Sequence, residues 1–182
     1  MKEKTIYILL SDTGTLLTRL IRLYTRAELN HASIAFDDDL REVYSFGRKS
    51  PGNPFIGGFI KEDLGGGLFR HATCAVYSCK VSQRKYERIR NYVRSFEQDP
   101  DRYRYNFLGL FGVMFHVRIK RQHAFFCSQF VASAFEKNGL SLVPKCPSLT
   151  TPADLERSPS LELMFRGELS RFGSRQVPLH RL

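Results

Sequence analysis

A cysteine stands where the sequence predicts the start of a helix. Residues 125–139 are predicted to be helical up to an Asn-Gly stop, which places Cys127 in the first turn. The unpaired N–H groups and the dipole at this end of a helix favour a thiolate over a thiol. Val131 and Ala134 follow at i+4 and i+7, so the sulfur shares the face that packs inward. We therefore interpret Cys127 as a candidate nucleophile, with a small buried residue among phenylalanines as the alternative.

Histidine is the side chain best suited to act as a base for a thiol near neutral pH. His31 is the first candidate, because it stands at the entrance of a predicted β-hairpin and follows a polar stretch. An ordinary surface histidine is the alternative. The other four histidines lack this strand-turn-strand context, and of these His123, four residues before Cys127, is the fallback base.

A histidine base needs a third group that holds its ring in the right orientation. The strand that returns from the hairpin offers Glu42, Tyr44 and Ser45. Glu42 and Tyr44 share one face of that strand, and Ser45 lies on the other. Only the residues on one of these faces can contact His31. Glu62, in a glycine-rich segment further along, is a further candidate.

Hydrophobic periodicity and turn signals predict the elements that must position these residues. The predicted strands cover residues 4–10, 31–36, 42–46, 73–81 and 161–166, and the predicted helices cover 15–28, 82–97, 105–111, 125–139 and a short stretch from 151. The glycine- and proline-rich segment Gly47–Gly67 is predicted to be a long loop, a candidate lid or substrate rim.

These elements predict an α+β fold in a single domain that covers residues 1–182. We expect a small antiparallel sheet that carries His31. The helix that bears Cys127 packs against this sheet, and the helix over residues 82–97 lies outside.

Two blocks of the sequence, residues 31–47 and 125–131, resemble the signature blocks of a known enzyme family. The first reads His-Ala-Ser-Ile-Ala-Phe, an acidic turn and Glu-Val-Tyr-Ser-Phe-Gly, and the second reads Phe-Phe-Cys-Ser-Gln-Phe-Val. With histidine before cysteine in the chain, they resemble the permuted papain-like cysteine amidases and peptidases, the YaeF/YiiX-type relatives of NlpC peptidases. Such relatives commonly carry Glu or His where Ser45 falls here, so the sequence departs from the family pattern at the third catalytic position. Ser45 and Glu42 are the residues we assign to that position.

The resemblance implies a permuted papain-like (NlpC-type) fold and a cysteine hydrolase. Such an enzyme cleaves an amide bond, of a peptide or cell-wall type, through an acyl-thioester on Cys127 with His31 as base. The Cys127 N–H is the expected oxyanion donor, with Tyr105 and Tyr7 as candidates for a second. Two alternatives stay open: a lipid-directed acyltransferase or phospholipase similar to the lecithin retinol acyltransferase relatives, and a binding module without turnover. We expect no metal and no organic cofactor.

The composition limits which binding partners and which cellular compartment we expect. A formal net charge of +10 favours an anionic substrate or surface, including contact with a membrane through basic faces. No groove-reading or RNA-binding signature appears, so nucleic acid is not an expected partner. The first residues do not have the pattern of a signal peptide, and no apolar run is long enough to span a membrane. The four cysteines show no paired spacing. We therefore expect a cytoplasmic protein with reduced thiols.

Overall fold

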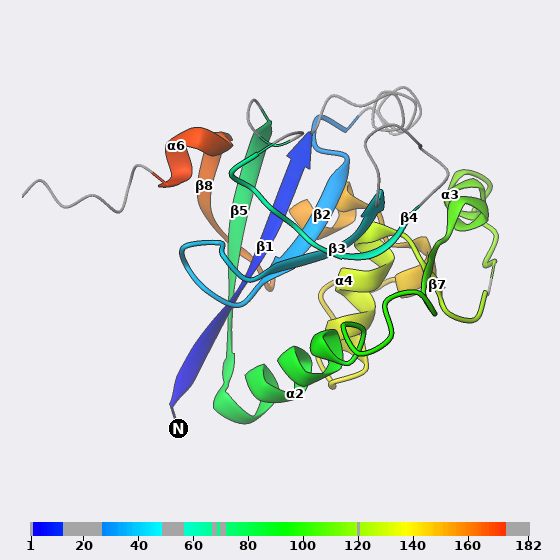
Figure 1. Cartoon of the computed structure of the whole chain (residues 1–182), viewed down its shortest axis with the longest axis horizontal. Coiled ribbons are helices and arrows are strands. Elements are labelled where there is room, and N and C mark those ends of the chain that lie inside the picture. Colours follow the sequence, from blue (N-terminus) through cyan, green and yellow to red (C-terminus); the bar gives the residue numbers. More distant parts are fainter. Residues whose placement is uncertain are drawn as a thin grey trace, which may run out of the picture.

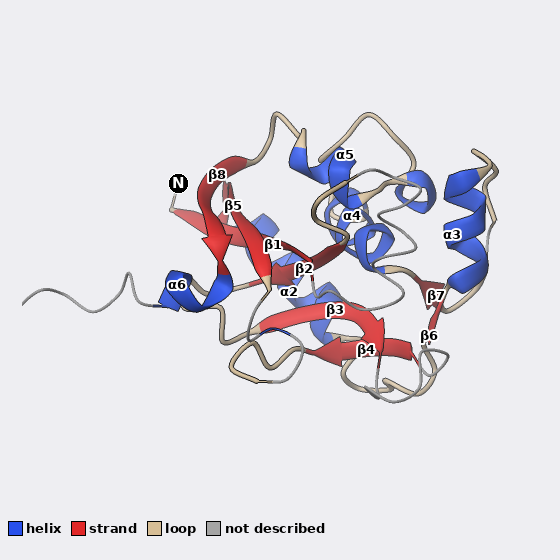
Figure 2. Ribbon diagram, turned by 90° about the horizontal axis from the view of Figure 1, so that it is seen from above, coloured by secondary structure: helices blue, strands red, loops and turns tan. Residues whose placement is uncertain are grey.

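A computed structural model describes residues 2–12, 27–48, 57–66, 69, 72–119 and 121–173. Over these residues the chain is α+β, with an eight-stranded, mostly antiparallel open sheet and five α-helices (Figures 1 and 2). The helix predicted over residues 15–28 lies outside the described residues except for Ala27 and Glu28, and neither of these is helical.

The sheet has the strand order β7-β6-β4-β3-β2-β1-β5-β8. Its strands are β1 (Glu3–Asp12), β2 (His31–Ala35), β3 (Val43–Arg48), β4 (Gly57–Lys61), β5 (Thr73–Ser82), β6 (Arg104–Tyr105), β7 (Ala124–Phe125) and β8 (Glu162–Glu168). All neighbours pair antiparallel except β6 and β7. The sheet is therefore larger than the one predicted from the sequence, because β4, β6 and β7, which the sequence does not predict as strands, extend it at one edge.

The hairpin predicted around His31 is present. β2 pairs with β3 through Ile34↔Tyr44 and Ala35↔Val43, and the Asp37 carboxylate holds the turn by accepting from the Arg41 N–H at 2.7 Å. The pairing does not continue towards His31, so β2 and β3 separate there. This separation leaves an opening at the start of β2.

The prediction of a loop over Gly47–Gly67 is wrong in its second half, which contains β4. β4 pairs with β3 over five residues, from Tyr44↔Lys61 to Arg48↔Gly57. Gly57 serves a close approach there, because a Cβ at this position would lie 2.8 Å from the Tyr105 Cβ and 2.9 Å from the Gly47 oxygen. The glycines that read as a loop thus let strands pack closely, while residues 49–56 lie outside the described residues.

The helices are α2 (Gln83–Arg94), α3 (Phe107–Met114), α4 (Cys127–Glu136), α5 (Pro152–Glu156) and α6 (Leu169–Gly173), with a 3-10 turn η2 (Pro147–Leu149). The Ser82 hydroxyl caps α2 by accepting from the Lys85 N–H, as the sequence predicts. α4 begins at Cys127, which confirms that this cysteine lies in the first helical turn.

Each face of the sheet has its own apolar core. On the face that carries α2 and α4, the core includes Ile8, Ile34, Phe46, Ile89 and Phe130. On the other face, Leu9, Val43, Val76 and Phe165 pack together. Alternate residues of one strand therefore enter different cores, which decides on which face each polar side chain of β2 and β3 lies.

Candidate active site

His31 lies at the start of β2, where β3 has separated from its neighbour. Its side chain is 14 % exposed, and its ring lies beside Phe69, with the ring centroids 6.5 Å apart. On β2, His31 and Ser33 lie on the face opposite to Ile34, which belongs to the core under α4. The imidazole thus lies at one end of an interior strand of the sheet and is only slightly exposed.

The His31 ring is held by the carboxylate of Glu62. The distance from His31 Nε2 to Glu62 Oε1 is 2.6 Å, and the Glu62 side chain is completely buried. Glu62 comes directly after β4, and its N–H donates to the Val43 oxygen at 2.9 Å, which continues the β3–β4 ladder by one residue. This register places the Glu62 carboxylate on the same face of the sheet as His31.

Two serine hydroxyls satisfy the rest of the Glu62 carboxylate. Ser45 on β3 donates to Oε1 at 2.5 Å, and Ser33 on β2 donates to Oε2 at 2.8 Å. Both hydroxyls are buried, so the carboxylate accepts three hydrogen bonds where water is excluded. A buried carboxylate that is paired and hydrogen-bonded in this way stays ionised.

Cys127 faces the other side of the imidazole. The His31 ring lies near enough to the sulfur to lower its pKa, and the Ala32 and Ser128 backbone amides act on the sulfur in the same direction. α4 contacts both β2 and β3, so its first turn enters the opening where these strands separate. The structure therefore brings Cys127, His31 and Glu62 together in one cluster.

The charges of Cys127, His31 and Glu62 stabilise one another. Burial would raise the pKa of the Cys127 thiol, but the hydrogen bond and charge of His31, helped by the Ala32 and Ser128 amides, hold that pKa below its usual range. Burial would lower the pKa of His31, but the charge of Glu62 and the contact with Cys127 raise it to about 10. Glu62 is buried as well, yet His31 and the two serines keep its pKa below its ordinary value. These shifts favour a thiolate–imidazolium–carboxylate row over a neutral thiol beside a neutral imidazole.

A tyrosine completes the surroundings of the sulfur. The Tyr105 phenol on β6 is buried beside Cys127, and its burial together with the negative sulfur raises its pKa well above the usual range. Its O–H therefore remains a donor. Tyr7, the other tyrosine considered from the sequence, packs instead against the core that contains Leu9, Val43, Val76 and Phe165.

Amide side chains connect the start of α4 to the start of α3. The Gln129 Oε1 accepts from the Phe126 N–H at 3.4 Å and from Asn106 Nδ2 at 3.5 Å, and Asn106 Oδ1 accepts from the Gly109 N–H at 3.0 Å. These contacts fix the segment that bears Tyr105 relative to the turn that bears Cys127. Neither Gln129 nor Asn106 is among the site residues predicted from the sequence.

Two residues predicted for this site lie elsewhere. Glu42 accepts from Arg90 at 2.5 Å and pairs with Arg94 at 2.9 Å, both on α2, and the arginine hydrogen bonds hold its pKa below the usual range although burial would raise it. It shares the face of Tyr44, which is the face opposite to His31. His123 is exposed, with its Nε2 3.3 Å from Arg102 Nη2. Ser45, in contrast, is in the cluster, where it donates to Glu62 rather than to the histidine.

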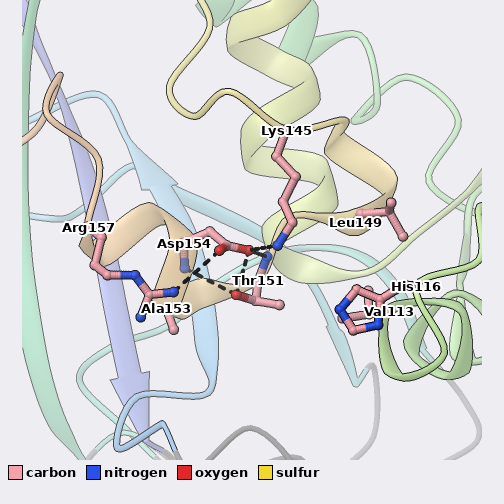
Figure 3. A pocket seen from close by; sticks show the side chains of 8 residues that line it. All are labelled: Val113, His116, Lys145, Leu149, Thr151, Ala153, Asp154 and Arg157. Carbon is pink, nitrogen blue, oxygen red and sulfur yellow. Dashed lines mark hydrogen bonds and ion pairs between the residues drawn. The ribbon is translucent and has the colours of Figure 1, made fainter.

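A separate pocket lies beside the first turn of α4. It has a volume of about 360 Å³ and is lined by residues of α3, α5 and the segment between α4 and α5: Val113, His116, Lys145, Leu149, Thr151, Ala153, Asp154 and Arg157 (Figure 3). The Asp154 carboxylate forms ion pairs with two lining residues: Lys145 Nζ lies 2.8 Å from its Oδ2, and Arg157 Nη2 lies 3.4 Å from its Oδ1. The pocket adjoins the site region through Ser128, whose hydroxyl donates to the Thr150 oxygen at 2.8 Å.

Neither a metal site nor a membrane-spanning helix is found among the described residues. Those residues contain no group of three or more His, Cys, Asp or Glu side chains that could hold a metal ion. None of the helices among them is long and apolar enough to cross a membrane.

Comparison of the chain with protein-family models gives no match, and comparison with the curated proteins gives none either. The functional interpretation therefore depends on the geometry of the cluster.

Proposed function

We propose that the chain is a cysteine hydrolase of permuted papain-like (NlpC-type) architecture, with Cys127 as nucleophile, His31 as base and Glu62 as the residue that orients the histidine. The observation that carries the proposal is the cluster in which His31 is hydrogen-bonded to the buried Glu62 carboxylate and lies beside the Cys127 sulfur. A thiolate beside an imidazolium that a buried carboxylate orients is the arrangement that activates cysteine nucleophiles. The order of histidine before cysteine in the chain agrees with the permuted family that the two sequence blocks resemble.

The reaction follows from the charges of the three groups. The Cys127 thiolate attacks an acyl carbonyl carbon, and the His31 imidazolium gives its proton to the leaving nitrogen or oxygen, which produces a thioester. Water or another acceptor then attacks the thioester while neutral His31 takes its proton, and the thiolate leaves. Glu62 keeps the ring oriented and stabilises its positive charge in both steps.

The residues around the sulfur provide donors for the oxyanion. The Cys127 N–H is the first amide of α4 and has no partner within the helix. The Tyr105 O–H lies against the same sulfur. We assign these two groups to stabilising the negative oxygen of the tetrahedral intermediate.

The substrate is proposed to contain an amide bond, as in a peptide or cell-wall-type fragment. An acyltransferase or phospholipase that acts on a lipid ester is the second candidate, and the same thioester serves it. A binding module without turnover would need no oriented base, and the three hydrogen bonds accepted by Glu62 argue against it.

The proposal is tested by site-resolved alkylation with iodoacetamide at near-neutral pH. The experiment uses a Cys146→Ser background, because Cys146 is partly exposed and its hydrogen bond with Ser148 also lowers its pKa. Cys127 is expected to react faster than a free thiol, and the thioester is then sought by intact mass after addition of peptide or phospholipid. If Cys127 alkylates no faster than a free thiol, both enzyme proposals fail.

A further inference from the structure

Exposed apolar side chains gather at one end of the molecule. Among the described residues five large apolar side chains are exposed, and three of them lie in or just after α3: Leu108 at 52 %, Phe115 at 69 % and Val117 at 56 %. α3 stands at the end of the molecule opposite to α6, outside the main part of the sheet (Figures 1 and 2). We call Phe115 and Val117, which follow the last residue of α3, the α3 tip.

A defined turn holds the α3 tip. The Val117 N–H donates to the Gly112 oxygen at 2.8 Å, and the His116 N–H donates to the Val113 oxygen at 3.3 Å. The chain folds back so closely that a Cβ on Gly112 would lie 2.6 Å from the Val117 oxygen. Phe115 and Val117 are therefore exposed on a fixed turn, which is unfavourable in water unless a partner covers them.

The surroundings of the α3 tip are basic. Arg118 and Arg121 follow it and are exposed, and the sequence places Lys120 between them. The pocket next to the tip adds Lys145 and Arg157, which share the single carboxylate of its lining, Asp154 (Figure 3). Apolar side chains beside an excess of cations fit the boundary between the acyl chains and headgroups of an anionic bilayer.

We propose that the α3 tip docks the protein on an anionic lipid surface, with Phe115 and Val117 in the interface and the flanking arginines against lipid headgroups. The chain's net charge of +10 favours the same encounter over a longer distance. α3 begins two residues after Tyr105, the phenol of which contacts Cys127. Docking therefore holds the candidate active site close to the membrane, although binding itself does not depend on the chemistry proposed above.

The test is co-sedimentation of the purified full chain with phosphatidylcholine vesicles and with vesicles that also contain phosphatidylserine. Binding is expected only to the second kind and is expected to weaken with added salt. Phe115→Ser with Val117→Ser should reduce the affinity at least about tenfold, since two apolar side chains leave the interface. Leu163→Ser with Met164→Ser is the matched control, because these β8 residues are exposed to a similar degree, 51 % and 48 %.

A second pair of variants tests the charges. Arg118→Gln with Arg121→Gln should weaken binding by about fivefold for each charge removed. Arg84→Gln with Arg88→Gln, which removes two exposed charges from α2, should have a smaller effect. Equal losses for the two pairs would mean that net charge alone attracts the protein, which overturns the docking site.

Two further outcomes overturn the proposal. One is the absence of binding to vesicles of either composition. The other is a concentration-dependent dimer that the Phe115→Ser, Val117→Ser variant loses, because the tip would then contact a second copy of the chain. Alkylation of Cys127 in the same variants reports on the candidate active site separately, so failure of docking and failure of the proposed chemistry can be told apart.

Discussion

Cys127 and Cys74 are both buried, yet their surroundings shift the two thiol pKa values in opposite directions. Cys74 lies on β5 in the core that contains Val76 and Phe165, and burial raises its pKa to about 12 although the charge of Arg166 acts the other way. Cys127 lies at the start of α4, where His31 and backbone amides outweigh the effect of burial and lower the pKa. Burial of a cysteine therefore says little about its reactivity, and the donors that face the sulfur decide it.

The largest expected effect comes from removing the imidazole. In His31→Ala the burial of Cys127 is no longer outweighed, so its pKa should rise and its alkylation at neutral pH should slow by about a hundredfold. Site-resolved mass spectrometry of iodoacetamide-treated protein gives the rate. Cys74 should stay unreactive in both proteins, and an unchanged rate at Cys127 would show that His31 does not activate it.

Neutralising the buried carboxylate should have the next largest effect. Glu62→Gln removes the charge that raises the pKa of His31, so the thiolate loses part of its partner and alkylation should slow by about tenfold. Glu42→Gln is the matched control, because Glu42 pairs with Arg90 and Arg94 on α2. Equal rates in these two variants would contradict the role assigned to Glu62.

The same carboxylate should make stability depend on pH. Its pKa is below 4.5 when folded, so the unfolded chain binds more protons in acid, and the contribution of Glu62 is full above pH 4.5 and is lost as pH falls through the folded pKa. At neutral pH, Glu62→Gln should lower the free energy of unfolding by about 3 kcal/mol. Urea unfolding of both proteins should show this difference shrinking in acid, and a difference independent of pH would mean that Glu62 is not ionised when folded.

The smallest expected effect is at the other thiol. Cys74→Ala removes a buried sulfur from an apolar core and should destabilise the fold by about 1 kcal/mol. Alkylation of Cys127 should not change, because Cys74 contributes no donor or charge to that site. A slower reaction at Cys127 would contradict this separation between Cys74 and the candidate site.

Local signals predicted the parts of the site that depend on short stretches of chain. The Asn-Gly stop and the apolar spacing predicted the helix that Cys127 begins, and the acidic turn predicted the hairpin that His31 enters. Alternation on β3 separated Glu42 from Ser45, but alternation alone could not tell which face His31 shares. That choice depends on the tertiary packing of α2 and α4 on one face.

The position of Glu62 depends on contacts that no local pattern reports. β4 is rich in glycine, so its residues read as a loop, and only its pairing with β3 places the carboxylate beside His31. The Ala32 amide is available to Cys127 because β2 and β3 separate, which is a property of the sheet rather than of either strand. Tyr105 likewise reaches the sulfur through β6, a strand of two residues that pairs with β4 over a long sequence distance.

Whether Cys127 is a thiolate at neutral pH can be measured directly. Ultraviolet absorbance of thiolate can be followed against pH in a Cys146→Ser protein, with the Cys127→Ser, Cys146→Ser protein as the reference. We expect the difference spectrum to show the thiolate absorbance of Cys127 at neutral pH. This absorbance should disappear only on acidification. A Cys127 thiol that first ionises at or above its ordinary value of 9.0 would contradict the thiolate–imidazolium pair.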